Sequence, residues 1–361
     1  MVDGRGVAAV ADVLDARDGA AFVHVGDRWD ADLGYVTGVD GGARESAYVQ
    51  TAGGERYYCP PPGRADVAFD GTVVSAGEFD ARAAGERAAA VLDGDGGTVL
   101  VPRAIPHDAA VYLERAGFDV ASTDALDRAR AVKTPSERER LRAVQSAASA
   151  GLDRARAVLG AATPTGDGLR YEGDPLTAER LRRAVNAALA GAGVDPAENT
   201  VVAGASGRGD ARLTAGEPVV VDVAPRGRAG YHGRLARTVV ADTDGGWERR
   251  AHLAATSALD VGVAELAAGT PVRRAREEAL AELVAYGFDD GAASVHGIGR
   301  SPREAPAGGS DAPLEAGQVI ALAPGVTDPV EGTVRVADAA VVTADGAEFL
   351  ADHATGLAPT R

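Results

Sequence analysis

The chain has 361 residues, of which 45% are hydrophobic and 25% are charged. A chain of this length and composition can bury one large core or two ordinary ones, which excludes a disordered protein. Its 53 acidic residues outnumber the 37 basic ones and give a formal net charge of −16. Because this charge repels phosphate groups and anionic lipids, we expect no nucleic acid and no membrane as partners.

The basic residues are almost all arginine, because Lys133 is the only lysine. A surplus of carboxylates with so little lysine is typical of a salt-adapted, halophilic protein. Molar salt shortens the Debye length to about 3 Å and so screens the repulsion between surface carboxylates. The alternative, an acidic protein from a genome rich in G and C, stays open.

Cys59 is the only cysteine, which excludes an internal disulfide and a cysteine cluster for zinc or iron–sulfur. We expect its thiol to be buried and unreactive. Residues 1–18 mix apolar and charged side chains and lack the apolar core of a signal peptide. No apolar run long enough to span a membrane occurs elsewhere, so we expect a cytoplasmic protein.

The first third of the chain alternates short strands with helices. Apolar runs bounded by Gly, Pro and Asp predict strands at residues 20–25, 46–59 (with a turn at Gly53-Gly54), 72–74 and 98–101. Between them, Ala, Arg, Glu and Leu at helical spacing predict helices at residues 79–92 and 107–116. We therefore expect an α/β domain over residues 1–128.

A second domain is expected over residues 129–361. Thr134 and Glu137 form the pattern of a capping box around Pro135, and apolar residues then recur every three or four positions to about residue 159. Further helices are expected at residues 175–190, 247–268 and 271–286, and strands at 219–223, 235–240, 319–322, 334–336 and 339–342. Because a pair of helices precedes a group of strands twice along this domain, the order suggests two similar α+β halves.

Several segments of the second domain are similar to the motifs of one enzyme family. These are residues 130–137, 218–222, 230–238, 295–299, 317–325 and 332–338. In this order they resemble the catalytic domain of the creatinase and proline aminopeptidase group of M24 metallopeptidases, and Tyr35-Val-Thr-Gly38 is similar to the first domain of proline peptidases. The resemblance implies an α+β protein that is also a homodimer: a pita-bread C-terminal domain preceded by a smaller ribonuclease-H-like α/β domain.

The resemblance also implies a site for two divalent cations such as manganese, cobalt or zinc, held by two Asp, one His and two Glu. Asp222 and His296 match the first aspartate and the histidine, whereas Arg234, Ala323 and Ala337 stand at the other three positions. An arginine cannot be deprotonated in a protein. At about 4 Å from a divalent ion, and an effective dielectric constant of about 20, it costs about 8 kcal/mol of repulsion. We therefore expect no bound metal and no peptidase activity.

The acid–base residues of the family are also altered. No histidine lies between residues 204 and 217, and Arg303-Glu304-Ala305-Pro306 replaces the family's His-Glu-x-Pro. His296 is then the one candidate for proton transfer, although a hydrogen-bonded loop histidine is the favoured interpretation. Similarly, Arg234 either binds an anion or, as we favour, pairs with Asp222.

Other residues of these segments are candidates for a binding pocket. Arg237, Arg303, Glu304 and Arg335 would line it, or Arg237 and Arg335 would instead tie strands together. The glycines of residues 204–209 suggest a nucleotide loop, but a strand follows where a helix would have to begin, so we reject that function.

The sequence leaves three functions open. The favoured one is a pseudoenzyme whose pocket binds a peptide or a small anionic ligand. The second is an active Xaa-Pro aminopeptidase, dipeptidase or amide hydrolase that uses Mn, Co or Zn at a non-standard site. The third is an assembly role beside a homologous active subunit.

Overall fold

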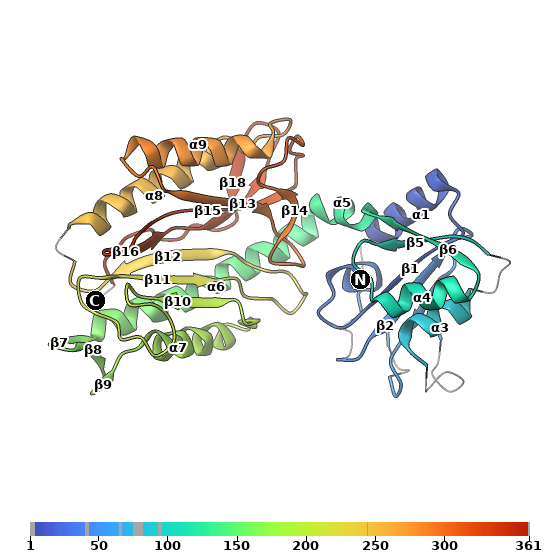
Figure 1. The fold of residues 1–361 in the computed structure, drawn as a ribbon, viewed down its shortest axis with the longest axis horizontal. Helices are drawn as coiled ribbons and strands as arrows, with labels where there is room; N and C mark the ends of the chain where they lie inside the picture. The colour runs from blue at the N-terminus through green and yellow to red at the C-terminus, as the bar shows by residue number, and fades with distance from the viewer. Residues whose placement is uncertain are drawn as a thin grey trace. The chain divides into compact units, whose positions relative to one another are not determined.

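The computed structural model describes residues 4–39, 43–64, 67–74, 82–92, 96–243 and 245–359. The chain divides into two compact units, Met1–Arg130 and Ala131–Arg361, where the sequence suggested a division after residue 128 (Figure 1). In the described part of the chain, none of the helices has the length and apolar character needed to cross a membrane.

The first unit is a single sheet with helices on both faces. Its strands lie in the order β4-β3-β2-β1-β5-β6, with β1 antiparallel to β2 and parallel to β5. The strands are β1 (Ala21–Gly26), β2 (Ser46–Thr51), β3 (Arg56–Cys59), β4 (Thr72–Val73), β5 (Gly97–Pro102) and β6 (Phe118–Thr123). Helices α3 (Ala84–Val91) and α4 (His107–Arg115) cover one face, and α1 (Arg5–Arg17), α2 (Ala31–Thr37) and α5 (Ala125–Ala131) cover the other.

The sequence predicted the strands of this sheet better than its helices. It missed α1, α2, β6 and α5. Within the described residues, the helix expected at 79–92 begins only at Ala84, and residues 79–81 lie outside them. Cys59 is buried, and burial raises the pKa of its thiol to about 11.

The second unit is built from two halves, each a sheet covered by a pair of helices. The first half holds α6 (Pro135–Ala161), a small hairpin sheet of β7 (Thr163–Thr165), β8 (Gly168–Tyr171) and β9 (Asp174–Pro175), helix α7 (Ala178–Gly191), and the sheet of β10 (Thr200–Ala203), β11 (Pro218–Val223) and β12 (Leu235–Val240). The predicted capping box starts α6: Thr134 Oγ1 accepts from the Glu137 amide at 3.3 Å, and the Thr134 amide donates to Glu137 Oε2 at 2.8 Å.

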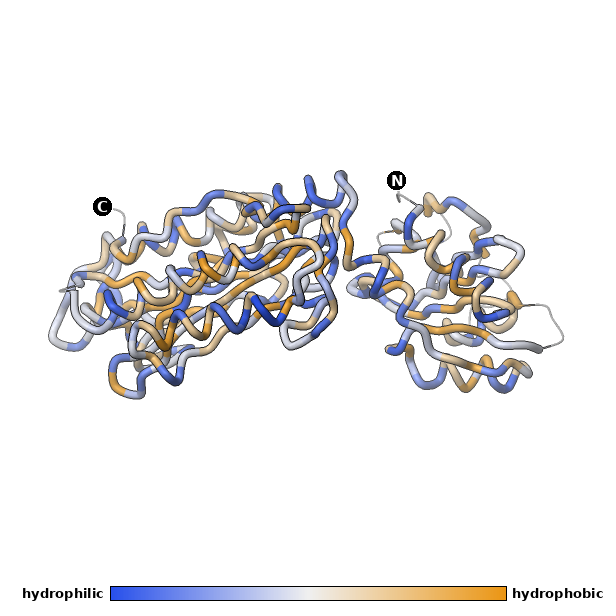
Figure 2. The backbone as a smooth tube through the Cα atoms, turned by 90° about the horizontal axis from the view of Figure 1, so that it is seen from above, coloured by the Kyte–Doolittle hydropathy of each residue, from blue (hydrophilic) through white to orange (hydrophobic). Residues whose placement is uncertain are grey.

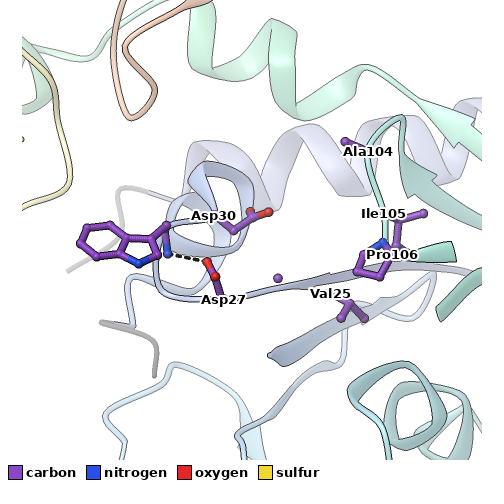
Figure 3. Close-up of a pocket in the computed structure, with 8 residues that line it drawn as sticks. Val25, Asp27, Asp30, Ala104, Ile105 and Pro106 are labelled. Atoms are coloured by element: carbon purple, nitrogen blue, oxygen red, sulfur yellow. Dashed lines mark hydrogen bonds between the residues drawn. The ribbon is translucent and has the colours of Figure 1, made fainter. Parts of the chain in front are cut away.

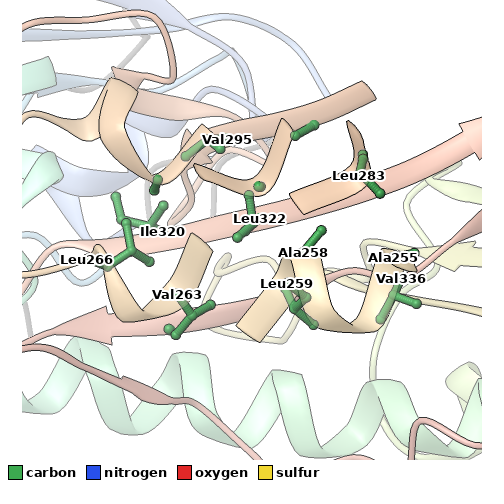
Figure 4. Close-up of a cluster of buried hydrophobic side chains, with 14 of the residues drawn as sticks. Ala255, Ala258, Leu259, Val263, Leu266, Leu283, Val295, Ile320, Leu322 and Val336 are labelled. Carbon is green, nitrogen blue, oxygen red and sulfur yellow. The ribbon is translucent and has the colours of Figure 1, made fainter. Parts of the chain in front are cut away.

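The second half has a larger sheet in the order β14-β13-β15-β17-β18, and β16 also pairs with β15. Its elements are α8 (Trp247–Ala264), α9 (Val272–Ala285), β13 (Ala292–Gly297), β14 (Glu304–Ala307), β15 (Val319–Asp328), β16 (Gly332–Arg335), β17 (Asp338–Val342) and β18 (Ala347–Phe349). Figure 4 shows α8 and α9 packing Leu259, Val263 and Leu283 against Ile320 and Leu322 of this sheet. In Figure 2 the apolar residues follow the strands, and polar residues follow the outer turns of the helices.

Two predicted boundaries in this unit were wrong for local reasons. The helix expected from residue 175 begins at Ala178, because Asp174–Pro175 pairs in β9 and Thr177 accepts from the Arg180 amide as the cap. The segment expected as a histidine loop at residues 295–299 is largely strand, since β13 extends to Gly297 and pairs with β15.

Candidate functional site

The inner faces of the two sheets bring the predicted metal positions together. Residues directly opposite each other in a sheet lie on the same face. Asp222 on β11 lies opposite Ala236 on β12, and on the other sheet Ala323 of β15 lies opposite Ser294, two residues before His296. The two sheets meet where Ala236, Ala323 and Ala337 form a small buried cluster, and where Ala236 and Ala337 exchange backbone hydrogen bonds of 3.0 and 3.1 Å.

Arg234 lies against the carboxylate that the sequence identified as the first metal position. Its Nη1 donates to Asp222 Oδ1, and its Nη2 donates to Asp222 Oδ2 at 2.9 Å. Arg335 Nη1 donates to the same Oδ2 at 3.4 Å. Asp222 is only 4% exposed, so two guanidinium groups share one buried carboxylate. This is the pairing that the sequence favoured for Arg234.

Positive charge dominates the surroundings of this pair. Burial, together with the nearby charges of Arg335 and Arg303, lowers the pKa of Arg234 to about 10. Two guanidinium groups therefore share a single carboxylate, and the charge of Arg303 also acts on Arg234, which leaves the surroundings of Asp222 positively charged inside a protein of charge −16. The side chain of Arg335 is 41% exposed, so this charge is open to solvent and attracts anions.

His296 is neutral at physiological pH. Burial lowers its pKa to about 4, and the charges of Arg303 and Arg234 act in the same direction. Its Nδ1 lies 3.0 Å from the carbonyl oxygen of Gly297, which can only accept, so Nδ1 carries the proton and Nε2 is an acceptor. The residue is a hydrogen-bonded strand histidine rather than the loop histidine that we expected.

Two residues predicted to line a pocket lie elsewhere. Arg237 is fully buried, and its five donors are all used: they meet the carbonyls of Ala236, Ala337, His353 and Ala354, and Asp338 Oδ2 at 2.6 Å. Glu304 forms an ion pair of 3.0 Å with Lys133, and both side chains are 1% exposed. Arg237 and Glu304 are therefore structural, and only Arg303 and Arg335 of the predicted pocket residues lie near Arg234.

A further buried imidazole, which was not among the predicted site residues, lies close to Arg234 in the sequence. His232 lies two residues before Arg234 and is 6% exposed. Its Nδ1 donates to the Ala224 carbonyl at 3.3 Å, and burial lowers its pKa. His232 is not at a histidine position of the family, and the one signal for it in the sequence is its place inside the matched segment 230–238.

The loop at residues 204–209 does not form a phosphate site. The first amides of α7 are already bonded, since Ala178 N donates to Ala211 O at 3.0 Å and Glu179 N to Gly209 O at 2.7 Å. The rejection of a nucleotide loop is consistent with this geometry.

The donors at the five family positions do not suit a pair of divalent cations. They supply one carboxylate, one imidazole, one guanidinium and two methyl groups, and the carboxylate is bonded to the guanidinium. Across the residues that the structure describes, no group of three or more His, Cys, Asp or Glu could hold a metal ion.

Comparisons with known proteins agree with this architecture. The model of metallopeptidase family M24 matches residues 139–344. Among solved structures, the chain is similar to a prolidase from Pyrococcus horikoshii (17% identity, TM-score 0.82, 98% of this chain and 99% of that one) and to an Xaa-Pro dipeptidase from Bacillus anthracis (17%, 0.84, 98% of each). It is also similar to a dipeptidase from Mycobacterium ulcerans (23%, 0.77, 99% and 98%). No curated protein sequence matches the chain. The expected fold, a pita-bread domain preceded by a smaller α/β domain, is confirmed.

Proposed function

The chain belongs to metallopeptidase family M24, and from this premise we propose that it works without a metal centre, as a binding protein for a small anion or for the carboxylate of a peptide. The single observation that supports this most is the guanidinium of Arg234 on the Asp222 carboxylate. A divalent cation at this position would have to displace a guanidinium that stays positively charged at neutral pH.

The charge of the site also supports an anionic ligand. Asp222 orients Arg234 and one nitrogen, Nη1, of Arg335 through hydrogen bonds. A single carboxylate cannot neutralise both guanidinium groups, so positive charge remains for an anion. Arg303 is exposed, and its side chain donates a long hydrogen bond of 3.4 Å to Ser294 Oγ. Guanidinium groups bind carboxylates and phosphates through two parallel hydrogen bonds, so Arg303 and Arg335 are the residues that would hold the ligand.

Peptide hydrolysis would in addition need a group that activates water. His296 is neutral and buried, and the positive charges of Arg234, Arg303 and Arg335 disfavour both a bound metal cation and a protonated imidazole at this place. We therefore propose that the peptidase activity of the family is lost in this chain. The expectation that the protein is a homodimer stays a prediction, which light scattering tests.

The first experiment measures metal content and hydrolysis together. We incubate the full chain with manganese, cobalt or zinc, in low and in molar salt, and then measure bound metal and the cleavage of an Xaa-Pro dipeptide. We expect less than stoichiometric metal and no turnover. Stoichiometric metal with a turnover that Asp222→Ala abolishes would refute the proposal and favour the peptidase alternative.

The second experiment measures anion binding by calorimetry, with succinate as the probe. Arg335→Ala removes charged hydrogen bonds worth about 1.5–3 kcal/mol, so we expect affinity to fall about tenfold to a hundredfold. Arg335→Lys keeps the positive charge but cannot form two parallel hydrogen bonds, so its affinity for succinate should lie between those of the wild type and Arg335→Ala. The matched control is Arg249→Ala, an exposed arginine on α8, which should leave succinate binding unchanged.

A further inference from the structure

The first unit has a cavity of its own, which the family resemblance does not use. It has a volume of about 480 Å³ and is lined by residues that follow two neighbouring parallel strands, β1 and β5. After β1 the chain passes to α2 on one face of the sheet, and after β5 it passes to α4 on the other face. Where two parallel neighbours diverge in this way, a crevice opens at their carboxyl ends, which is the usual ligand position in such sheets.

The walls of this crevice are apolar on one side and acidic on the other. Figure 3 shows Val25, Ile105 and Pro106 facing the carboxylates of Asp27 and Asp30. The lining residues include no Lys, Arg or His. The N-terminus of α4 lies next to Pro106, and Asp108 in its first turn offsets the positive end of that helix.

Among the described residues, the contacts that hold both carboxylates in place use Oδ1, so Oδ2 of each is available to a ligand. Asp30 caps α2: its Oδ1 accepts from the Leu33 amide at 2.8 Å and lies 2.7 Å from Nε2 of the buried His24. Asp27 Oδ1 accepts from the Trp29 amide at 2.8 Å (Figure 3). Gly26 is needed for this arrangement, because a Cβ there would lie 2.7 Å from Asp30 Oδ2.

We propose that this crevice binds a small organic cation, a primary ammonium group attached to an apolar body. The ammonium would donate to Asp27 and Asp30, and the apolar body would lie against Val25, Ile105 and Pro106. A hydrogen bond between charged partners is about twice as strong as one between neutral groups, so the ammonium determines the specificity. A divalent metal ion is a poorer occupant, because half of the wall offers it no oxygen.

The test is titration of the full chain with phenethylammonium chloride, followed by calorimetry. We expect saturable binding of this cation, and much weaker binding of 2-phenylethanol and of 3-phenylpropionate, which have the same ring without the positive charge. Asp27→Asn and Asp30→Asn should each reduce the affinity about tenfold or more. Asparagine keeps the cap of α2, so Asp30→Asn should fold normally.

The matched control is Asp119→Asn, an exposed residue at the opposite, amino end of the sheet in β6. It should leave the affinity for phenethylammonium unchanged. Equal affinity for 2-phenylethanol, or binding that the double variant Asp27→Asn/Asp30→Asn does not weaken, would overturn the proposal. Neither variant should alter succinate binding, so this site and the arginine cluster are tested separately.

Discussion

The full burial of Arg237 makes its removal the sharpest test of how the two sheets of the second unit are joined. We consider Arg237→Met, which keeps much of the side-chain volume. It leaves the buried carboxylate of Asp338, which is 5% exposed, without its cation. It also removes the hydrogen bonds that the guanidinium donates to four backbone carbonyls. Breaking a buried ion pair from one side costs about 3–5 kcal/mol. Since whole domains are stable by about 5–15 kcal/mol, most of the stability of this unit could be lost.

The effect should depend on pH. Burial raises the pKa of Asp338 to about 6, even though Arg237 lowers it. A carboxyl with a raised folded pKa stabilises the fold below its unfolded pKa of about 4 and loses that contribution as the pH rises through its folded pKa. Without Arg237 the pKa rises further, so Asp338 is neutral over a wider range. We therefore expect Arg237→Met to destabilise the protein less at pH 5 than at pH 8.

Urea unfolding followed by circular dichroism, at both pH values, measures this difference. A loss of about 3–5 kcal/mol lowers the urea midpoint of the second unit by about 1–2 M. Arg237→Lys keeps the charge near Asp338 but has three donors in place of five, so it should lie between the wild type and Arg237→Met. If the midpoint at pH 8 does not change, or if the loss is the same at pH 5, the argument for a structural arginine is wrong.

Three further predictions concern other buried groups. Lys133→Met should destabilise the protein by about 3–5 kcal/mol because it removes the cation that is paired with the buried carboxylate of Glu304, and the double variant with Glu304→Gln should recover part of this loss in urea titrations. Proton NMR should show that His296 titrates near pH 4, and that Arg303→Ala raises this pKa. Because the pKa of His296 is lowered in the folded state, its contribution to stability is present above about pH 6.5 and is lost as the pH falls toward 4. Cys59 should react with thiol reagents only after unfolding, since its buried thiol has a pKa of about 11; fast labelling of the native protein would contradict this.

The sequence predicted those parts of the fold whose cause is local. The capping box of Thr134 and Glu137 fixes the start of α6 within a few residues, and the apolar run of β12 gave Leu235–Val240 without error. The pairing of Asp222 with Arg234 could be predicted because Asp222 lies on β11 and Arg234 directly precedes the neighbouring strand β12. In contrast, α1 was missed because the first residues were assessed only as a possible signal peptide, although Val10, Val13 and Leu14 form its buried side.

The role of a side chain could not be predicted where its partner is distant in the sequence. Arg237 could equally have lined a pocket, because its acceptors on Ala337 and Asp338 lie about a hundred residues away. Glu304 could likewise have faced a ligand, and Lys133, its partner, is 171 residues away. The role of Arg237 depends on the docking of one sheet against the other, and the role of Glu304 depends on the packing of the segment before α6 against β14; no local pattern encodes either contact.

The long reach of these junction contacts has a consequence for the order in which the second unit folds. Within each half, neighbouring strands such as β11 and β12 come from nearby parts of the chain, so their loops close at little entropic cost. The contacts between Arg237 and Asp338, and between Thr238 and Arg335, close loops of about a hundred residues. Since distant contacts form slowly, we expect each half to form first and the junction to close last. Changes at Arg237 would then act mainly on the rate of unfolding, and the lifetime of the native state would depend on this one buried guanidinium.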